Sequence, residues 1–162
     1  MSGLDRRWQS VHRILAVRMD NLGDVVMTGP ALRALKEALP QAHLTLLVSP
    51  AGEAAAHLLP WADDALAWRS LWQDLGHLPF APERELELIR TLRAGAYDAA
   101  IIFTSFSQTP HVAAYACYLA GIPLRLGATD DGAGSLLTTR HHWPPGLYHE
   151  VERALNLVGA VG

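Results

Sequence analysis

The chain has 162 residues, of which 50% are hydrophobic and 18% charged, and this composition excludes an intrinsically disordered protein. The length is close to that of a typical single domain, so we expect one hydrophobic core and little room for a second. Thirteen basic residues stand against sixteen acidic ones, a formal charge of −3 that lacks the basic excess of most nucleic-acid-binding proteins. The sequence therefore predicts no nucleic-acid partner.

Cysteine content and apolar run lengths indicate a cellular compartment. The single cysteine, Cys117, cannot form an internal disulfide, and its apolar neighbours predict a buried thiol in a reducing environment. Residues 1–12 contain no apolar run of the kind that a signal peptide needs, and no stretch approaches the ~18 apolar residues of a membrane span. We therefore expect a cytoplasmic protein, and we leave open that it works beside a membrane.

The first half of the chain alternates predicted strands and helices. Residues 13–18 form an apolar run that is typical of a buried parallel strand. Helical spacing follows over 23–39, where Pro30 allows two forms: a helix that begins at Asp24 and kinks at Pro30, or one capped by Thr28 with Pro30 in its first turn. Further elements are predicted as a strand over 43–48, a short helix over 50–59 and a brief strand over 65–68.

After an irregular segment over 69–82, the second half continues the alternation. The predicted elements are a helix over 83–94, a strand over 98–103, a helix over 110–120, a short strand over 124–127, a loop over 129–146 with one strand at 136–140, and a final helix over 148–158. This order predicts an α/β domain with a mostly parallel sheet and helices on both faces. Ligands of such sheets bind at the carboxyl ends of the strands, so the loops there are the candidate sites.

The loop after the first strand, RMDNLGD over 18–24, is the first candidate. It has one glycine where a dinucleotide-binding fingerprint needs three, and it does not match the phosphate-binding P-loop. What it offers is the carboxylate of Asp24 at the start of a helix. This carboxylate is a helix cap, or a general base that takes a proton from a substrate hydroxyl, and the two roles can coexist.

A hydroxyl-rich turn after the central strand is the second candidate. It contains Thr104, Ser105, Ser107 and Gln108. These side chains can bind a sugar or a phosphate through short hydrogen bonds, but serine and threonine are also the commonest helix caps. By residue type alone the capping interpretation is favoured.

The histidines do not predict a metal site. Although the chain has eight of them, no H-x-x-x-H or H-E-x-x-H spacing occurs, and His141 and His142 are adjacent, so on a strand they would point to opposite faces. No G-x-S-x-G motif is present, and no cysteine or serine is visibly paired with histidine for covalent catalysis. We therefore expect neither metal binding nor a covalent intermediate.

A group of aromatic residues could serve packing or a membrane surface. Its members are Trp61, Trp68, Trp72 and Phe80. Because aromatic side chains mainly serve packing, we expect them to cover one end of the sheet, with membrane contact as the alternative.

Three ordered segments resemble one known family. They are RILAVRMDNLGDVVMTGPALRALKEALPQAHLTLLVSP over 13–50, YDAAIIFTSFSQTPHVAAYACYLAGIPLRLG over 97–127, and YHEVERALNLVGAVG over 148–162. Together they are similar to the opening half of the family 9 glycosyltransferases, the ADP-heptose:lipopolysaccharide heptosyltransferases and their relatives. The resemblance covers nearly everything after residue 12, so we treat 1–12 as an amino-terminal extension.

The resemblance implies a GT-B enzyme, in which two Rossmann-like domains face each other across a cleft. Residues 13–162 would form the amino-terminal, acceptor-side domain with a three-layer α/β/α fold, and the carboxyl-terminal, donor-binding domain would be absent from this chain. The implied reaction is an inverting transfer of heptose from ADP-heptose to a lipopolysaccharide core or a similar glycan or lipid-linked sugar. It needs no metal and no cofactor, and the chain alone is expected to be inactive.

The resemblance also assigns site residues. The aspartate of the family's G-D pair, proposed as the catalytic base, falls on Asp24, and Asn21 and Gly23 lie in the loop that carries it. The turn with Thr104, Ser105, Ser107 and Gln108 becomes a wall of the acceptor cleft. A stand-alone Rossmann-like binding or interaction module without catalysis is the alternative.

Overall fold

The computed structural model describes residues 3–74, 76–146 and 149–162. Within these ranges the strands are β1 (Arg13–Arg18), β2 (His43–Val48), β3 (Asp64–Ala67), β4 (Ala99–Ile102), β5 (Leu124–Ala128) and β6 (Thr139–His141). The α-helices are α1 (Leu22–Met27), α2 (Gly29–Ala38), α3 (Glu53–Leu58), α4 (Pro82–Ala94), α5 (His111–Leu119) and α6 (Glu150–Val158). Two short 3-10 helices, η1 (Pro50–Gly52) and η2 (Gly159–Val161), complete the described elements.

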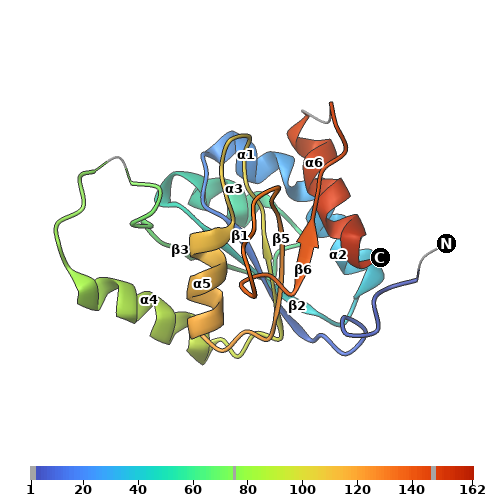
Figure 1. Ribbon diagram of the computed structural model, residues 1–162, viewed down its shortest axis with the longest axis horizontal. Coiled ribbons are helices and arrows are strands. Elements are labelled where there is room, and N and C mark those ends of the chain that lie inside the picture. The colour runs from blue at the N-terminus through green and yellow to red at the C-terminus, as the bar shows by residue number, and fades with distance from the viewer. Residues whose placement is uncertain (1–2, 75, 147–148) are drawn as a thin grey trace.

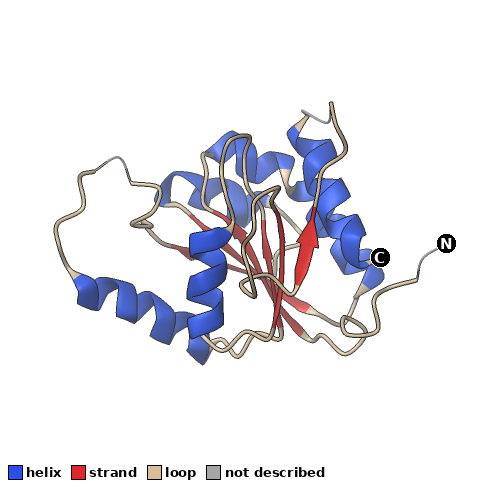
Figure 2. Cartoon of the chain, viewed as in Figure 1, coloured by secondary structure: helices blue, strands red, loops and turns tan. Residues whose placement is uncertain are grey.

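The strands form one parallel sheet in the order β3-β2-β1-β4-β5-β6. Helices α1, α2, α3 and α6 cover one face, and α4 and α5 cover the other, so the molecule has three layers (Figure 1; Figure 2). The prediction of a Rossmann-like α/β/α fold with a parallel sheet is therefore confirmed.

The sheet buries side chains on both faces, because successive residues of a strand point to opposite sides. In β1, Ile14 and Ala16 belong to the larger core cluster, with α1, α2, α3 and α6, whereas Leu15 and Val17 belong to the smaller one, with α4 and α5. Such doubly buried strands are mostly apolar, and β1 and β2 begin and end where the sequence predicts.

Of the two forms allowed over 23–39, the helix that starts at Thr28 with Pro30 in its first turn is confirmed as α2. The single helix from Asp24 that kinks at Pro30 is wrong, because a separate helix, α1, ends at Thr28. Thr28 ends α1, where its N–H and its hydroxyl both donate to the carbonyl oxygen of Asp24, and it is also the N-cap residue of α2. Pro30 lies in the first turn of α2. A proline is tolerated there because its missing N–H would have no partner within the helix.

Three other predicted elements differ from the structure. The helix predicted over 50–59 divides into η1 and α3. The strand predicted at 136–140 is β6, which begins at Thr139, while Leu137 is buried in the smaller core cluster without belonging to a strand. The final helix begins at Glu150, and Tyr148, where we expected its start, lies outside the described residues.

The sequence also predicts the burial of Cys117 and the placement of four aromatic side chains. Cys117 is 1% exposed, which confirms the buried thiol. The aromatic residues do not form one group: Trp61 packs against the larger cluster and Trp68 and Trp72 against the smaller one, on opposite faces of the sheet, and Phe80 is 97% exposed. Our expectation that they jointly cover one end of the sheet is therefore wrong.

The segment before β1 packs on the domain. Trp8 is fully buried, and Val11 joins it in the larger core cluster. A boundary at residue 13 between an extension and the domain stays a prediction. No helix in the described ranges is both long and apolar enough to cross a membrane.

Candidate functional site

A cavity lies where the sheet changes its direction of winding, between β1 and β4. The chain leaves β1 toward α1 on one face and leaves β4 toward α5 on the other, and such a switch point opens a crevice at the carboxyl ends of the strands. The cavity has a volume of about 910 Å³. Its polar lining includes Asp20, Asn21, Gln73, Thr104, Ser107 and Gln108.

The first loop is shaped by the cap of α1. The cap is Asn21, whose Oδ1 accepts a hydrogen bond from the backbone N–H of Asp24 at 3.1 Å. The capping interpretation of Asp24 is therefore wrong. Gly23 is exposed in the first turn between them. Because Asn21 satisfies the helix start, the carboxylate of Asp24 is available for other contacts, with 16% of its side chain exposed.

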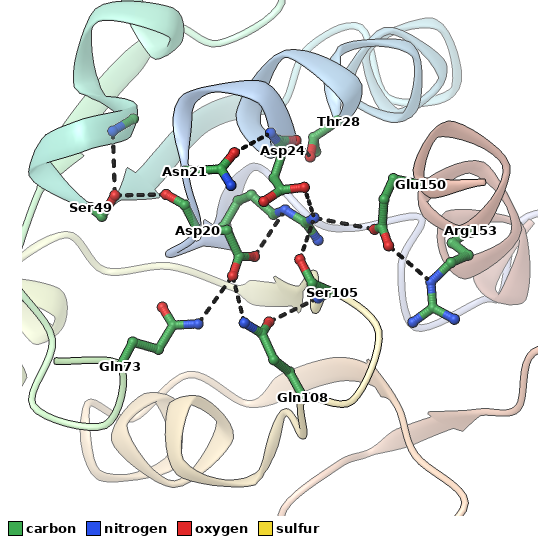
Figure 3. Close-up of polar contacts among 12 residues, drawn as sticks. Asp20, Asn21, Asp24, Thr28, Ser49, Gln73, Ser105, Gln108, Glu150 and Arg153 are labelled. Atoms are coloured by element: carbon green, nitrogen blue, oxygen red, sulfur yellow. Dashed lines mark hydrogen bonds and ion pairs between the residues drawn. The ribbon is translucent and has the colours of Figure 1, made fainter. Parts of the chain in front are cut away.

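Arg18 is the centre of the site, and our reading of the sequence missed it. Its guanidinium lies 3.2 Å from Asp20 Oδ2, 3.4 Å from Asp24 Oδ1 and 3.2 Å from Glu150 Oε2, and it donates to the hydroxyl of Ser105 at 3.1 Å. The side chain is 3% exposed. Arg18 thus joins the ends of β1 and β4 to the start of α6. Figure 3 shows its partners Asp20, Asp24, Ser105 and Glu150 gathered around one point.

The carboxylate of Asp20 ties three loops together. Its Oδ1 accepts hydrogen bonds from the side-chain amides of Gln73 at 3.2 Å and Gln108 at 2.7 Å. Gln108 in turn accepts the backbone N–H of Ser105 at 2.8 Å through Oε1 (Figure 3). Asp20 Oδ2 faces Arg18 without the alignment of a hydrogen bond.

The hydroxyl-rich turn does not cap the following helix. The N-cap residue of α5 is Pro110, and no side chain caps this helix. The capping interpretation of Thr104, Ser105 and Ser107 is therefore wrong. Thr104 is buried and Ser107 is exposed with a positive φ of 69°; both line the cavity, whereas Ser105 contacts Arg18.

The predicted site residues fall into two groups. Asn21, Thr104, Ser107 and Gln108 line the cavity. Gly23, Asp24 and Ser105 are outside its lining. Arg18 contacts both Asp24 and Ser105, and it also contacts Asp20, which lines the cavity.

A second arginine, Arg153, contacts the other carboxylate oxygen of Glu150. Arg153 Nε lies 3.6 Å from Glu150 Oε1, and its guanidinium stacks 3.6 Å from the centre of the Trp143 ring. Burial lowers the pKa of Arg153 from its ordinary value, while Glu150 acts in the opposite direction. These contacts hold Glu150 at the start of α6 facing Arg18.

The charged cluster is net negative. Arg18 and Arg153 carry two positive charges, and Asp20, Asp24 and Glu150 carry three negative ones. Of the described residues that line the cavity, none is a lysine or an arginine. Over the same part of the chain, no group of three or more His, Cys, Asp or Glu residues is placed to hold a metal ion.

No family model and no curated protein matches the chain. Several solved structures match the chain. A family 9 glycosyl transferase from Veillonella parvula aligns with 99% of this chain at a TM-score of 0.72 and 17% identity. The ADP-heptose LPS heptosyltransferase II of E. coli aligns with 90% (TM-score 0.68, 22% identity), and E. coli heptosyltransferase WaaC, solved with ADP-2-deoxy-2-fluoro heptose, with 92% (TM-score 0.65, 22% identity).

The aligned regions make up 42%, 40% and 48% of those three proteins, so this chain spans less than half of their length. At such identities the likeness concerns the fold. The chain has the same Rossmann-like α/β fold as the aligned parts of these glycosyltransferases, as the resemblance predicted.

Proposed function

We propose that this chain is the amino-terminal, acceptor-binding part of an inverting, metal-independent glycosyltransferase. The donor is a nucleotide-diphosphate sugar, ADP-heptose, held by a second domain, and the acceptor is a glycan or a lipid-linked sugar such as a lipopolysaccharide core. The enzyme works in the cytoplasm, at the inner face of the cytoplasmic membrane. The fold shared with two heptosyltransferases supports the reaction class.

In the proposed reaction Asp24 is the general base. Its carboxylate takes the proton from the acceptor hydroxyl as the hydroxyl oxygen bonds to the anomeric carbon of the donor. The bond from that carbon to the diphosphate breaks on the opposite face, so ADP leaves with the electron pair and the configuration inverts. The donor-binding domain stabilises the charge on the departing diphosphate.

The observation that carries the proposal is the placement of Asp24. Asn21 caps α1, so the carboxylate of Asp24 is not consumed by the helix start. It is partly exposed beside the switch point, and Arg18 fixes one of its oxygens at 3.4 Å. A base held in one orientation, with a second oxygen available, is what proton abstraction from a bound hydroxyl needs.

The test uses the complete reading frame that contains this chain. ADP release is measured with ADP-heptose and lipopolysaccharide-core acceptors for the unchanged protein, Asp24→Asn and the control Asp130→Asn. We expect Asp24→Asn to lower kcat by about 10²–10⁴-fold, as loss of a general base does. Asp130 is 91% exposed and makes one contact to His142, so its variant should keep full activity.

Two results would argue against the proposal. An Asp24→Asn enzyme with full turnover would contradict the base assignment. An unchanged protein that binds glycans but never releases ADP would favour a binding module without catalysis. For the 162-residue chain alone, we expect calorimetry to detect no binding of ADP-heptose, because the donor belongs to the second domain.

A further inference from the structure

We propose that Glu150, at the start of α6, is a positioning residue for the base: it holds the guanidinium of Arg18 in place, and Arg18 in turn orients the carboxylate of Asp24. The inference rests on the proposed function and deepens it. It assigns to Glu150 a role in turnover that is distinct from the contribution to folding that a buried ion pair can make.

Two hydrogen bonds orient the guanidinium of Arg18. Its Nη2 donates to the hydroxyl of Ser105 at 3.1 Å and to Glu150 Oε2 at 3.2 Å. The same nitrogen lies 3.4 Å from Asp24 Oδ1 as an ion-pair partner, and Nε faces Asp20 Oδ2 without the alignment of a hydrogen bond. A hydrogen bond between two charged groups is roughly twice as strong as one between neutral groups. The bond to Glu150 therefore sets the direction in which Arg18 faces Asp24.

The carboxylate of Glu150 is itself held on both oxygens. Oε2 binds Arg18, and Oε1 lies 3.6 Å from Nε of Arg153, whose guanidinium stacks on the ring of Trp143. Figure 3 shows Asp24 and Arg153 on opposite sides of Glu150. The side chain of Arg153 is 6% exposed and that of Glu150 18% exposed. A carboxylate with an arginine at each oxygen cannot turn freely, so its hold on Arg18 is rigid.

The needs of the helix do not explain this placement of Glu150. Glu150 and Glu152 both lie in the first turn of α6, where a negative charge interacts favourably with the helix dipole. Glu152 serves that purpose from the exposed side, whereas Glu150 faces the buried Arg18. Because desolvation offsets most of the attraction within a buried ion pair, stability alone is a weak reason for it. Orientation of the reactive carboxylate of Asp24 accounts for the convergence on Arg18.

The test is a double-mutant cycle on the complete reading frame that contains this chain. ADP release is measured with ADP-heptose and lipopolysaccharide-core acceptors for the unchanged protein, Glu150→Gln, Asp24→Asn and the double variant. Glu150→Gln keeps the shape of the side chain and removes its charge. It should lower kcat by about 10–100-fold, because misplacing a catalytic group by about 1 Å can cost about 10²-fold. The KM values of both substrates should change by less than about twofold.

The cycle and a matched control separate positioning from folding. When Asp24 is already asparagine, Glu150→Gln should change the residual kcat by less than about twofold, because the group that Glu150 positions is gone. Glu152→Gln removes the same charge from the same helical turn and should leave kcat within about twofold of the unchanged protein. On the 162-residue chain, the carboxyl-carbon NMR signal of Asp24 should move in Glu150→Gln and stay in place in Glu152→Gln.

Three results would overturn the inference. A Glu150→Gln enzyme with full turnover, or an Asp24 signal that does not move, would show that Glu150 does not act on the base. An equal loss of kcat in the presence and absence of the Asp24 carboxylate would mean that Glu150 serves folding or substrate binding instead. In these cases the base assignment of Asp24 is retained. An unchanged protein that releases no ADP refutes the proposed function and this inference with it, so the two failures can be told apart.

Discussion

Replacing Arg18 by methionine should destabilise the whole domain, because three carboxylates would lose their shared cation. The guanidinium lies 3.2–3.4 Å from Asp20, Asp24 and Glu150 and is 3% exposed. At an effective dielectric constant of about 20, each pair gains about 5 kcal/mol of gross attraction, most of which offsets desolvation. Removing one partner of a buried pair costs about 3–5 kcal/mol. Since Asp24 and Glu150 keep 16% and 18% exposure and hence some water, we expect the lower limit of about 3 kcal/mol.

Urea unfolding followed by tryptophan fluorescence measures this loss, because the free energy of unfolding extrapolates linearly to water. The matched control is Arg33→Met, whose guanidinium pairs with Glu37 at the surface at 2.8 Å, with 63% and 64% of the two side chains exposed. That change should cost about 0.5 kcal/mol or less. Arg18→Lys keeps the charge without the planar fork and should fall between the two. A loss for Arg18→Met within about 1 kcal/mol of the control would refute the reasoning.

Three further changes test other parts of the structure. Asn21→Ala removes the cap of α1 and should cost about 1 kcal/mol in the same urea assay; no loss would mean that the Asn21 side chain is not needed there. Gly52→Ala places a Cβ 2.7 Å from Val25 Cγ2 and should cost about 1–3 kcal/mol, whereas Gly132→Ala, with nothing within 4 Å, should cost less. Burial raises the pKa of the Cys117 thiol to about 12, although Arg125 acts to lower it. The thiol of the unfolded chain loses its proton near pH 9. The free energy of unfolding should therefore fall by about 1.4 kcal/mol per pH unit between about pH 9 and about pH 12. The urea midpoint of Cys117→Ala should fall less steeply over the same range.

The secondary structure was predictable wherever burial leaves a periodic signal. Both faces of β1 and β2 are buried, so each strand contains a run of mostly apolar residues that marks its position in the sequence. Helix α4 follows from leucines at helical spacing and from the glycine after it. In contrast, β6 has three residues, none of them buried, and the apolar Leu137 that suggested an earlier strand packs into the core from a loop. Short edge strands and buried loop residues have no period that a sequence could show.

The choice of capping residue shows a second limit. Asn21 and Asp24 lie three residues apart, and both residue types accept hydrogen bonds from helix N–H groups. Which one caps α1 depends on where the helix begins, and that position is set by how the loop leaves β1. The consequence is chemical: with Asn21 as the cap, the carboxylate of Asp24 faces Arg18 and keeps 16% of its side chain exposed.

The loop residues that line the cavity followed from the rule that loops at strand ends bind ligands. The charged cluster of Asp20, Asp24 and Glu150 follows instead from the buried charge of Arg18. Arg18 ends an apolar strand, where its neighbours in sequence predict only burial, and its partner Glu150 lies 132 residues away. A buried arginine must be matched by carboxylates, so wherever Arg18 is fixed, the loop with Asp24 and the start of α6 are fixed as well. The orientation of Asp24 therefore depends on α6 as much as on its own helix. Replacing Glu150 by glutamine would remove one carboxylate charge from Arg18 and loosen the proposed base without touching the loop that carries it.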